Sequence, residues 1–223
     1  MTDEITALLF DLDGTLCEYE RSPEETLPLA FEEAGVEPFF GIEAYYDRFE
    51  EFVDGSDEVR DLRERCFRAI ARDRDRDPEL GSRVADAYST LRDPGRVSPL
   101  PGAENVVETL AAEYRLGVVT NGPPDYQQPK LDTLEFTDAF ETVVFAGFDT
   151  AAKPEVEPFE RALADLDADA SGAVHVGNSL DSDVAGAQAA GLDAAWLDDG
   201  SDPELVPEYV LESLSDLLER PWT

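Results

Sequence analysis

The chain has 223 residues, of which 42% are hydrophobic, which is ordinary for a folded protein. Its charge is extreme, because 52 Asp and Glu against 17 Lys and Arg give a formal net charge of −35. Such a chain repels nucleic acid and anionic membranes, so neither is expected as a partner. The acidic residues are spread over the whole length, which suits folding in molar salt. We therefore expect a halophilic-type protein.

Cysteine usage and the first residues favour a cytoplasmic location. The two cysteines, Cys17 and Cys66, are too few for a disulfide framework. No basic segment of the signal-peptide type precedes the first apolar run, and no apolar run is long enough to span a bilayer. We expect a monomer or homodimer with reduced thiols.

Short apolar runs alternate with helical patterns along most of the chain. This alternation predicts an α/β fold with a parallel sheet and helices on both of its faces, a three-layer Rossmann-like core. The expected strands are 5–10, 116–120, 142–145, 173–176, 194–197 and 209–211. The expected helices between and after them are 103–113, 125–134, 156–166, 181–190 and 214–219.

One region breaks the alternation, because residues 18–97 contain no convincing strand. Ser22, Pro23 and Glu25 are typical of a capped helix start, and 42–53, 58–73 and 80–91 have helical spacing. A Pro/Gly-rich segment, 98–102, follows. We therefore expect residues 1–17 and 98–223 to form the α/β domain and residues 18–97 an inserted all-helical domain.

The first strand ends in Asp11-Leu12-Asp13-Gly14-Thr15. Ligands bind at the carboxyl ends of the strands in open α/β sheets. Two carboxylates at this spacing can share a divalent cation, and one can attack phosphorus while the other transfers a proton. Asp and Gly are also ordinary turn residues, so the pattern alone leaves both interpretations open.

Three further motifs follow this first one along the chain, so that four occur in order. They are Asp11-Leu12-Asp13-Gly14-Thr15-Leu16, Thr120-Asn121-Gly122, Lys153-Pro154, and Gly177-Asn178-Ser179-Leu180-Asp181-Ser182-Asp183. Together they resemble the motifs of the haloacid dehalogenase-like (HAD) superfamily over residues 5–200. The resemblance implies that the helical insert is a cap domain, which selects the leaving group.

The resemblance also implies roles for single residues. Asp11 resembles the nucleophile that forms an aspartyl-phosphate and contacts Mg²⁺, and Asp13 resembles the general acid and base, with a backbone carbonyl on the metal. Thr120 and Asn121 resemble the phosphate-binding residues. Lys153 resembles the cation that orients Asp11 and neutralises the phosphoryl group, as an electrostatic barrier requires.

The fourth motif departs from the common family pattern. Asn178 stands where an Asp usually binds the metal, and an amide oxygen can coordinate Mg²⁺ but brings no charge. Asp183 is a second candidate ligand, either directly or through water. A working but weaker Mg²⁺ site and a protein that has lost catalysis both remain open.

Other reactive residues have ordinary structural interpretations. Lys130 is expected to have a structural or capping role, and His175, inside a strand, is expected to be a half-buried residue with a satisfied nitrogen. Cys17 is interpreted as a packing residue. The aromatic residues of the insert are expected to form mainly its core; they include Phe39, Phe40, Tyr45, Tyr46, Phe49 and Phe52.

The expected activity is Mg²⁺-dependent hydrolysis of a small cytosolic phosphomonoester. The alternatives are a metal-independent 2-haloacid dehalogenase, a phosphomutase and a degenerate phosphate-binding protein. Asp13 argues against the dehalogenase, since members with that activity typically lack this second Asp.

Overall fold

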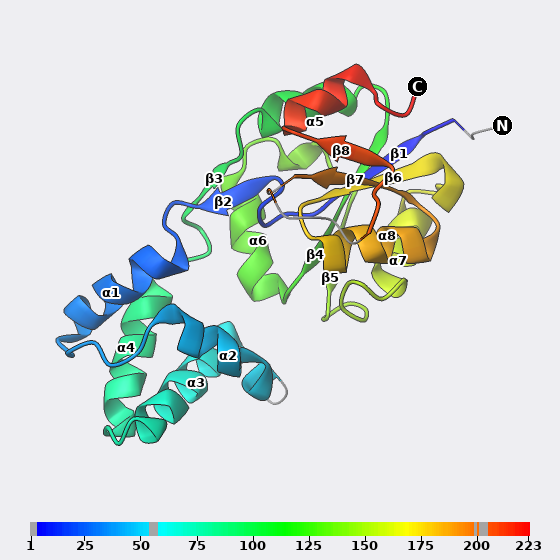
Figure 1. Cartoon of the computed structure of the whole chain (residues 1–223). Helices are drawn as coiled ribbons and strands as arrows, with labels where there is room; N and C mark the ends of the chain where they lie inside the picture. Colours follow the sequence, from blue (N-terminus) through cyan, green and yellow to red (C-terminus); the bar gives the residue numbers. More distant parts are fainter. Residues whose placement is uncertain (1–3, 54–57, 199, 201–204) are drawn as a thin grey trace. The chain divides into compact units, whose positions relative to one another are not determined.

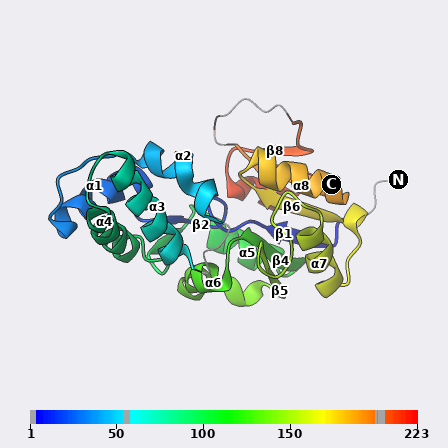
Figure 2. The same cartoon turned by 90° about the horizontal axis from the view of Figure 1, so that it is seen from below.

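Six parallel strands form the central sheet, in the order β5-β4-β1-β6-β7-β8 (Figures 1 and 2). A computed structural model describes residues 4–53, 58–198, 200 and 205–223. The strands are β1 (Ala7–Phe10), β4 (Arg115–Asn121), β5 (Thr142–Ala146), β6 (Ala173–Gly177), β7 (Asp193–Leu197) and β8 (Tyr209–Leu211). Each lies within two residues of an expected strand at either end, and the α/β prediction is confirmed.

Helices cover both faces of this sheet. Figure 1 shows α7 (Glu157–Asp165) and α8 (Ala185–Ala190) on one side, with α5 (Ala103–Leu110) and the C-terminal η4 (Leu214–Glu219) on the other. All four residues of β1 are buried, as expected for a strand between two helical layers. The α/β part of the chain also contains α6 (Pro124–Thr133) and the short helices η1 (Thr137–Ala139), η2 (Ala170–Gly172) and η3 (Leu180–Val184).

The helix expected at 181–190 begins differently from a regular α-helix. Its first turn, η3, is a π-helix, and α8 continues from it. The Ser179 hydroxyl caps this turn by accepting a hydrogen bond from Ser182 N, and the Ser179 carbonyl accepts one from Asp183 N. The wide turn is a common device at functional sites, where it redirects a side chain. The side chain concerned here is that of Asp183.

The chain divides into two units, Met1–Glu18 with Val97–Thr223, and Tyr19–Arg96. The second unit is helical and consists of α1 (Pro23–Ala34), α2 (Ile42–Val53), α3 (Val59–Asp73) and α4 (Pro78–Leu91). Ser22 and Glu25 form the expected capping box at the start of α1. Buried aromatic rings in edge-on contact hold the four helices together, among them Phe31, Phe40, Tyr45 and Phe67.

The aromatic residues predicted for this core fall into three groups by burial. Phe40 and Tyr45 are buried in it, and Phe39, Phe49 and Phe52 pack against it partly buried. Tyr46 is 51% exposed and is not a core residue. Its position on α2 places it on the outer face, one residue beyond the buried Tyr45.

Two short strands at the ends of the helical unit were missed by the sequence analysis. They are β2 (Cys17–Tyr19) and β3 (Val97–Pro99), and they form a separate two-stranded sheet. Each has three residues and is mostly exposed, so neither has an apolar run from which it could be predicted. The segment expected as a plain linker therefore begins with a strand.

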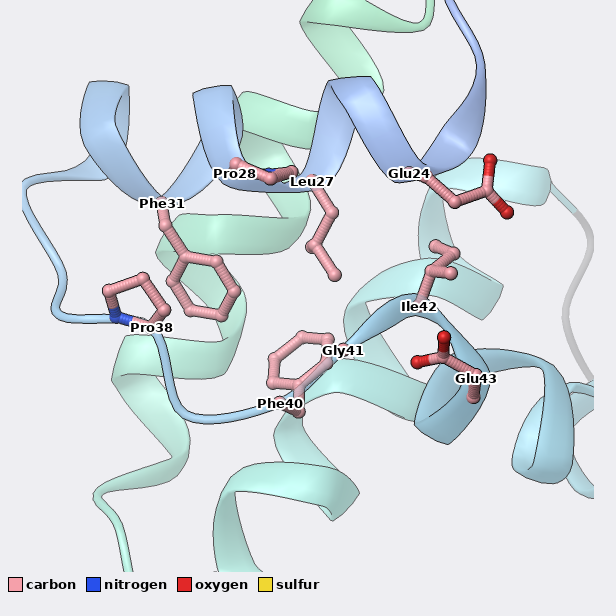
Figure 3. A pocket seen from close by; sticks show the side chains of 9 residues that line it. All are labelled: Glu24, Leu27, Pro28, Phe31, Pro38, Phe40, Gly41, Ile42 and Glu43. Atoms are coloured by element: carbon pink, nitrogen blue, oxygen red, sulfur yellow. The ribbon is translucent and has the colours of Figure 1, made fainter.

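A pocket of about 240 Å³ lies inside the helical unit (Figure 3). Its walls are mainly apolar, and Glu24 and Glu43 lie together at one end of it. None of the residues predicted for catalysis or metal binding lines it. Within the described ranges, no helix is both long and apolar enough to cross a membrane.

Candidate active site

The candidate catalytic residues lie at the carboxyl ends of three neighbouring strands. Asp11 directly follows β1, Asn121 ends β4, and Asn178 directly follows β6. The chain runs from β1 outward to β4 and β5, and then returns to the other side of β1 for β6, β7 and β8. Such a reversal leaves a crevice at the carboxyl ends of the central strands, where ligands bind in this class of sheet.

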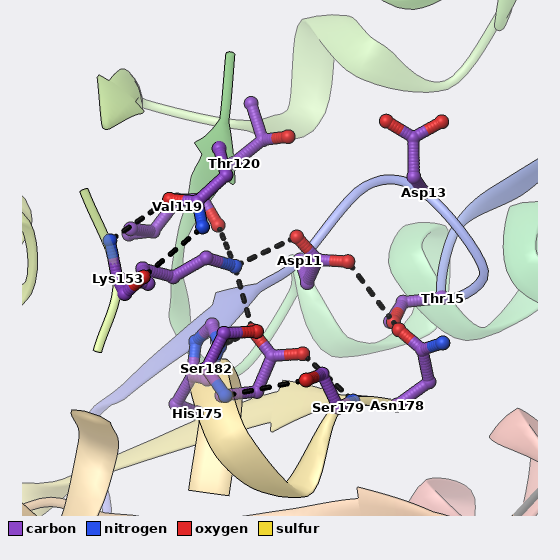
Figure 4. A network of polar contacts seen from close by, with 12 residues as sticks. Asp11, Asp13, Thr15, Val119, Thr120, Lys153, His175, Asn178, Ser179 and Ser182 are labelled. Carbon is purple, nitrogen blue, oxygen red and sulfur yellow. Dashed lines mark hydrogen bonds and ion pairs between the residues drawn. The ribbon is translucent and has the colours of Figure 1, made fainter. Parts of the chain in front are cut away.

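Asp11 and Lys153 form the centre of the site (Figure 4). Lys153 Nζ donates hydrogen bonds to Asp11 Oδ1 at 2.7 Å and to the Val119 carbonyl at 2.8 Å. Both side chains are almost fully buried. Burial raises the pKa of Asp11 to about 7, although the charge of Lys153 lowers it; the nearby charge of Asp183 adds to the increase. A divalent cation at this carboxylate would favour its ionised form.

Lys153 has a second carboxylate partner, Asp183, at 2.6 Å from Nζ to Oδ1. His175 Nε2 lies 3.1 Å from the same oxygen, and Ser179 N donates to Oδ2. Burial works against the charge of Asp183, but the Lys153 ammonium and the His175 hydrogen bond outweigh it and lower the pKa of this carboxyl. Two carboxylates likewise outweigh burial at Lys153 and raise its pKa. The ionised lysine is therefore held between two ionisable acids.

His175 is more deeply buried than expected, at 1% exposure; its Nε2 has the expected partner, whereas its Nδ1 is buried without a hydrogen-bond partner among the described residues. Burial lowers its pKa, so the ring is neutral near pH 7. Since the ionised Asp183 can only accept a hydrogen bond, Nε2 of the neutral ring carries the proton. The ring also packs edge-on against Phe159, with 5.0 Å between centroids.

Thr15 connects the nucleophile to the fourth motif. Its hydroxyl oxygen lies 3.5 Å from Asp11 Oδ2 and 3.3 Å from Asn178 Oδ1 (Figure 4). A single hydroxyl proton can serve only one of the two at a time. Gly14, at a φ of 79°, makes room for this arrangement, because a Cβ there would lie 2.6 Å from Asn178 Nδ2. Thr15 belongs to the first motif, but no role for it was predicted from the sequence.

These oxygen atoms form a donor set that fits Mg²⁺. Asp11 Oδ2 and Asn178 Oδ1 face the same threonine hydroxyl, and hard oxygen donors of this kind are the ligands that Mg²⁺ takes. Asp183 differs, because both of its oxygens accept hydrogen bonds from Lys153, His175 or Ser179 N. In the described part of the chain, no three His, Cys, Asp or Glu residues cluster as a metal site. A metal here would therefore depend on amide and backbone oxygens as well.

Asp13 is held by helix α6, at a distance from Asp11. Lys130 Nζ lies 2.7 Å from Asp13 Oδ1 and 2.6 Å from Oδ2, and Gln127 Nε2 donates to Oδ2 at 3.1 Å. Figure 4 shows the Asp13 carboxylate turned away from Asp11. Lys130 was expected to have a structural or capping role, and Gln127 was not considered for the site. Their contact with Asp13 joins parts of the chain that are more than 110 residues apart.

The two phosphate-binding candidates differ in what their side chains contact. Thr120 Oγ1 accepts a hydrogen bond from Gln127 Nε2 at 3.0 Å, which leaves its own proton for another acceptor. The Asn121 amide pairs with the Lys153 backbone, with Oδ1 accepting from Lys153 N and Nδ2 donating to Lys153 O. Asn121 thus fixes the loop that carries Lys153. Because Nδ2 carries two hydrogens and donates one to Lys153 O, the other is left for a phosphate oxygen.

Cys17 is buried, as its interpretation as a packing residue requires. Burial raises the pKa of its thiol to about 12, with the charge of Asp13 adding to the effect. A thiol of this kind is not a nucleophile near neutral pH.

Comparison with known proteins agrees with the motifs. The family model of the haloacid dehalogenase-like hydrolases matches residues 5–191. A glyceraldehyde 3-phosphate phosphatase of Pyrococcus abyssi is 30% identical over 86% of this chain and 81% of its own. The pyrophosphatase PpaX of Bacillus velezensis is 31% identical over 98% of this chain and 97% of its own.

The fold is shared with a solved structure of the HAD-hydrolase YfnB from Bacillus subtilis, which was bound to magnesium. The two structures superpose with a TM-score of 0.74 at 23% identity, over 98% of this chain and 99% of the other. At this identity the likeness concerns the fold. With the match of the family model over most of the sequence, it shows that the chain belongs to the haloacid dehalogenase-like hydrolases.

Proposed function

We propose that this hydrolase is an Mg²⁺-dependent phosphatase that acts on a small phosphomonoester through an aspartyl-phosphate on Asp11. The observation that carries the proposal is the setting of Asp11. One of its oxygens is bonded to Lys153 and the other faces Thr15, while a second acid, Asp13, lies in the same loop. A buried carboxylate next to a fixed ammonium can approach an anionic phosphate, because the positive charge reduces their repulsion.

In the first step, an oxygen of Asp11 forms a bond to phosphorus and the bond to the leaving oxygen breaks. Asp13, which first takes up a proton from solvent, donates it to that oxygen, so the alcohol leaves in neutral form. The Lys153 ammonium, whose three hydrogens already bond to Asp11, Asp183 and the Val119 carbonyl, would neutralise negative charge on the phosphoryl group, and the Thr120 hydroxyl would donate to one of its oxygens.

In the second step, Asp13, now a carboxylate, removes a proton from water. The water attacks phosphorus, the bond to Asp11 breaks, and inorganic phosphate leaves with Asp11 restored. Asp11, Asn178 and the backbone carbonyl of Asp13 would hold Mg²⁺. The ion would supply Lewis-acid stabilisation of the charge on the transferring group.

Several features of the chain support a phosphatase over the dehalogenase. Asp13 is present and is held by two polar partners, and two relatives are named for phosphatase or pyrophosphatase activity. A dehalogenase of this family would have no phosphoryl leaving group for Asp13 to protonate. Asp183 is proposed to position Lys153, since its oxygens already accept bonds from protein groups.

We also propose that the protein works in a salt-rich cytoplasm. The net charge of −35 supports this, because repulsion within such a chain is smallest where salt screens it. The helical unit is proposed to act as the cap that selects the leaving group.

The test is phosphate release from p-nitrophenyl phosphate and a panel of small phosphomonoesters, in molar KCl, with and without Mg²⁺. We expect turnover that requires Mg²⁺ and is lost in Asp11→Asn, by a factor of about 10⁴ or more for a nucleophile. Mass spectrometry of acid-quenched enzyme should find one phosphoryl group on Asp11. If no metal and no phosphomonoester supports turnover above that of Asp11→Asn, the phosphatase assignment is wrong.

A further inference from the structure

A buried lysine contacts the proposed acid and base of the reaction. The Lys130 side chain is 1% exposed, and its ammonium bonds to both carboxylate oxygens of Asp13, which is 40% exposed. Lys130 also lies over the ring of Tyr126, with 4.7 Å from Nζ to the centroid. The Lys130 ammonium therefore contacts Asp13 from a position that is almost fully enclosed by protein.

Helix α6 supplies this contact through one of its faces. Gln127 and Lys130 are three residues apart, so their side chains lie on the same face of the helix. Both are buried and both bond to Asp13. The neighbouring Gln128 instead bonds to Asp132 and is exposed. Lys130 therefore meets Asp13 from the buried face of α6.

Stability alone does not account for a lysine at this position. Burying an ammonium is costly, and a buried ion pair often contributes no more to stability than apolar residues of similar volume. Lysine is otherwise rare in this sequence, where 15 of the 17 basic residues are arginine. The other lysine, Lys153, holds the nucleophile.

The same helix face also contacts the phosphate-binding candidates. Gln127 Nε2 lies 3.0 Å from Thr120 Oγ1 and 2.6 Å from the Asn121 carbonyl, as well as 3.1 Å from Asp13 Oδ2. One amide thus spans the acid and the end of β4. Helix α6 therefore contacts both the proposed acid and a phosphate-binding candidate.

From these contacts we infer that Lys130, assisted by Gln127, is a positioning residue that fixes the Asp13 carboxylate for both of its proton transfers. The inference rests on the proposed function, in which Asp13 protonates the leaving oxygen and then activates water. Lys130 itself touches neither the substrate nor the reacting atoms in this scheme. Without it, the Asp13 side chain would sample other rotamers, and the proton transfers would slow.

The experiment compares Lys130→Met with wild type and with Gln128→Met, a control on the exposed face of the same helix. Two substrates are used, because a good leaving group needs little help from an acid and a poor one needs much. With glycerol 2-phosphate, we expect kcat of Lys130→Met to fall by about 10- to 100-fold, within the range for general acid–base catalysis. KM and inhibition by orthovanadate should stay within about twofold, since phosphate binding does not depend on Asp13.

With p-nitrophenyl phosphate, the same variant should show a pre-steady-state burst. The first step releases p-nitrophenolate without an acid, whereas breakdown of the aspartyl-phosphate still needs a base, so the phosphoenzyme accumulates. Quenched samples should contain more phosphorylated Asp11 than wild type does. Lys130→Gln, which removes the charge but keeps a polar end, should show the same pattern to a smaller degree, and it decides the question if Lys130→Met does not fold.

Two results would overturn the inference. Lys130→Met could behave like Gln128→Met on both substrates, or it could lose activity equally on both with a raised KM, as a damaged site would. The phosphatase assignment fails separately, if wild type and Asp11→Asn are equally inactive. Where wild type is active and Asp13→Asn shows the burst but neither Lys130 variant does, only the role of Lys130 is wrong.

Discussion

Lys153 and Asp183 form an ion pair of 2.6 Å in which the two side chains are only 1% and 2% exposed. The same ammonium bonds to Asp11, so its position depends on two acids at once. A close approach makes this possible, because a Cβ on Gly177 would lie 2.3 Å from Asp183 Cγ. A residue at the end of the fourth motif thus helps to hold the lysine that bonds to Asp11, the proposed nucleophile.

The first prediction concerns this pair. Asp183→Asn removes the negative charge that faces Lys153 but keeps the shape of the side chain. The lysine is then held less firmly against Asp11. We expect kcat to fall by about 10- to 100-fold, the usual effect of losing a supporting partner in such a site. The control is Asp181→Asn, an exposed residue in the same turn. Equal activity in both variants would show that Asp183 does not position Lys153.

The second prediction concerns the missing charge at Asn178. Asn178→Asp places a carboxylate beside Asp11, and Mg²⁺ binds charged oxygen more tightly than amide oxygen. The Mg²⁺ concentration for half-maximal activity should fall about tenfold, which corresponds to about 1.4 kcal/mol.

Asn178→Ala provides the opposite change, because it removes the oxygen altogether. It should raise the Mg²⁺ concentration for half-maximal activity, so that the value for wild type lies between those of the two variants. If all three proteins need the same Mg²⁺ concentration, residue 178 does not hold the metal.

The third prediction uses the burial of the single histidine. Burial lowers the pKa of His175 from 6.5, so the unfolded chain binds a proton that the folded protein excludes. As pH falls below about 6.5, wild type should therefore lose up to about 1.4 kcal/mol of unfolding free energy per pH unit from this residue. The measurement is urea unfolding of wild type and His175→Gln at several pH values. The difference between their unfolding free energies gives the contribution of the histidine. If that difference does not change with pH, the prediction is wrong.

The fourth prediction concerns salt. With a net charge of −35, the folded protein should gain stability as KCl screens its surface. Since the Debye length is already about 3 Å at 1 M salt, most of the gain in the urea midpoint should come below that concentration. A midpoint that stays flat from low to molar KCl would rule out the halophilic interpretation.

The sequence was sufficient for the features that depend on local pattern. Apolar runs predicted the six strands of the large sheet, and residues placed directly after them, such as Asp11 and Asn178, had to meet at one edge of a parallel sheet. The capping box at Ser22 and Glu25 was predicted from spacing alone.

The features that were missed depend on contacts between distant segments. Lys130 lies in the last turn of a helix, where a capping role is the ordinary expectation, and nothing in its neighbourhood indicates Asp13. The contacts of Asp183 could not be predicted either, because the π-turn directs its oxygens to Lys153, His175 and Ser179 N; its role as a metal ligand stays a prediction. Side-chain direction in such a turn cannot be obtained from spacing.

The burial of both lysines has a practical consequence for the chemistry of the intact protein. Each ammonium is enclosed and bonded to a carboxylate, with 1% of the side chain exposed, so acylating reagents find no accessible lysine amine on the folded protein. Lysine-directed labelling would therefore report opening of the candidate site around Asp11 and Asp13. Immobilisation through lysine amines would select molecules in which that site has already opened.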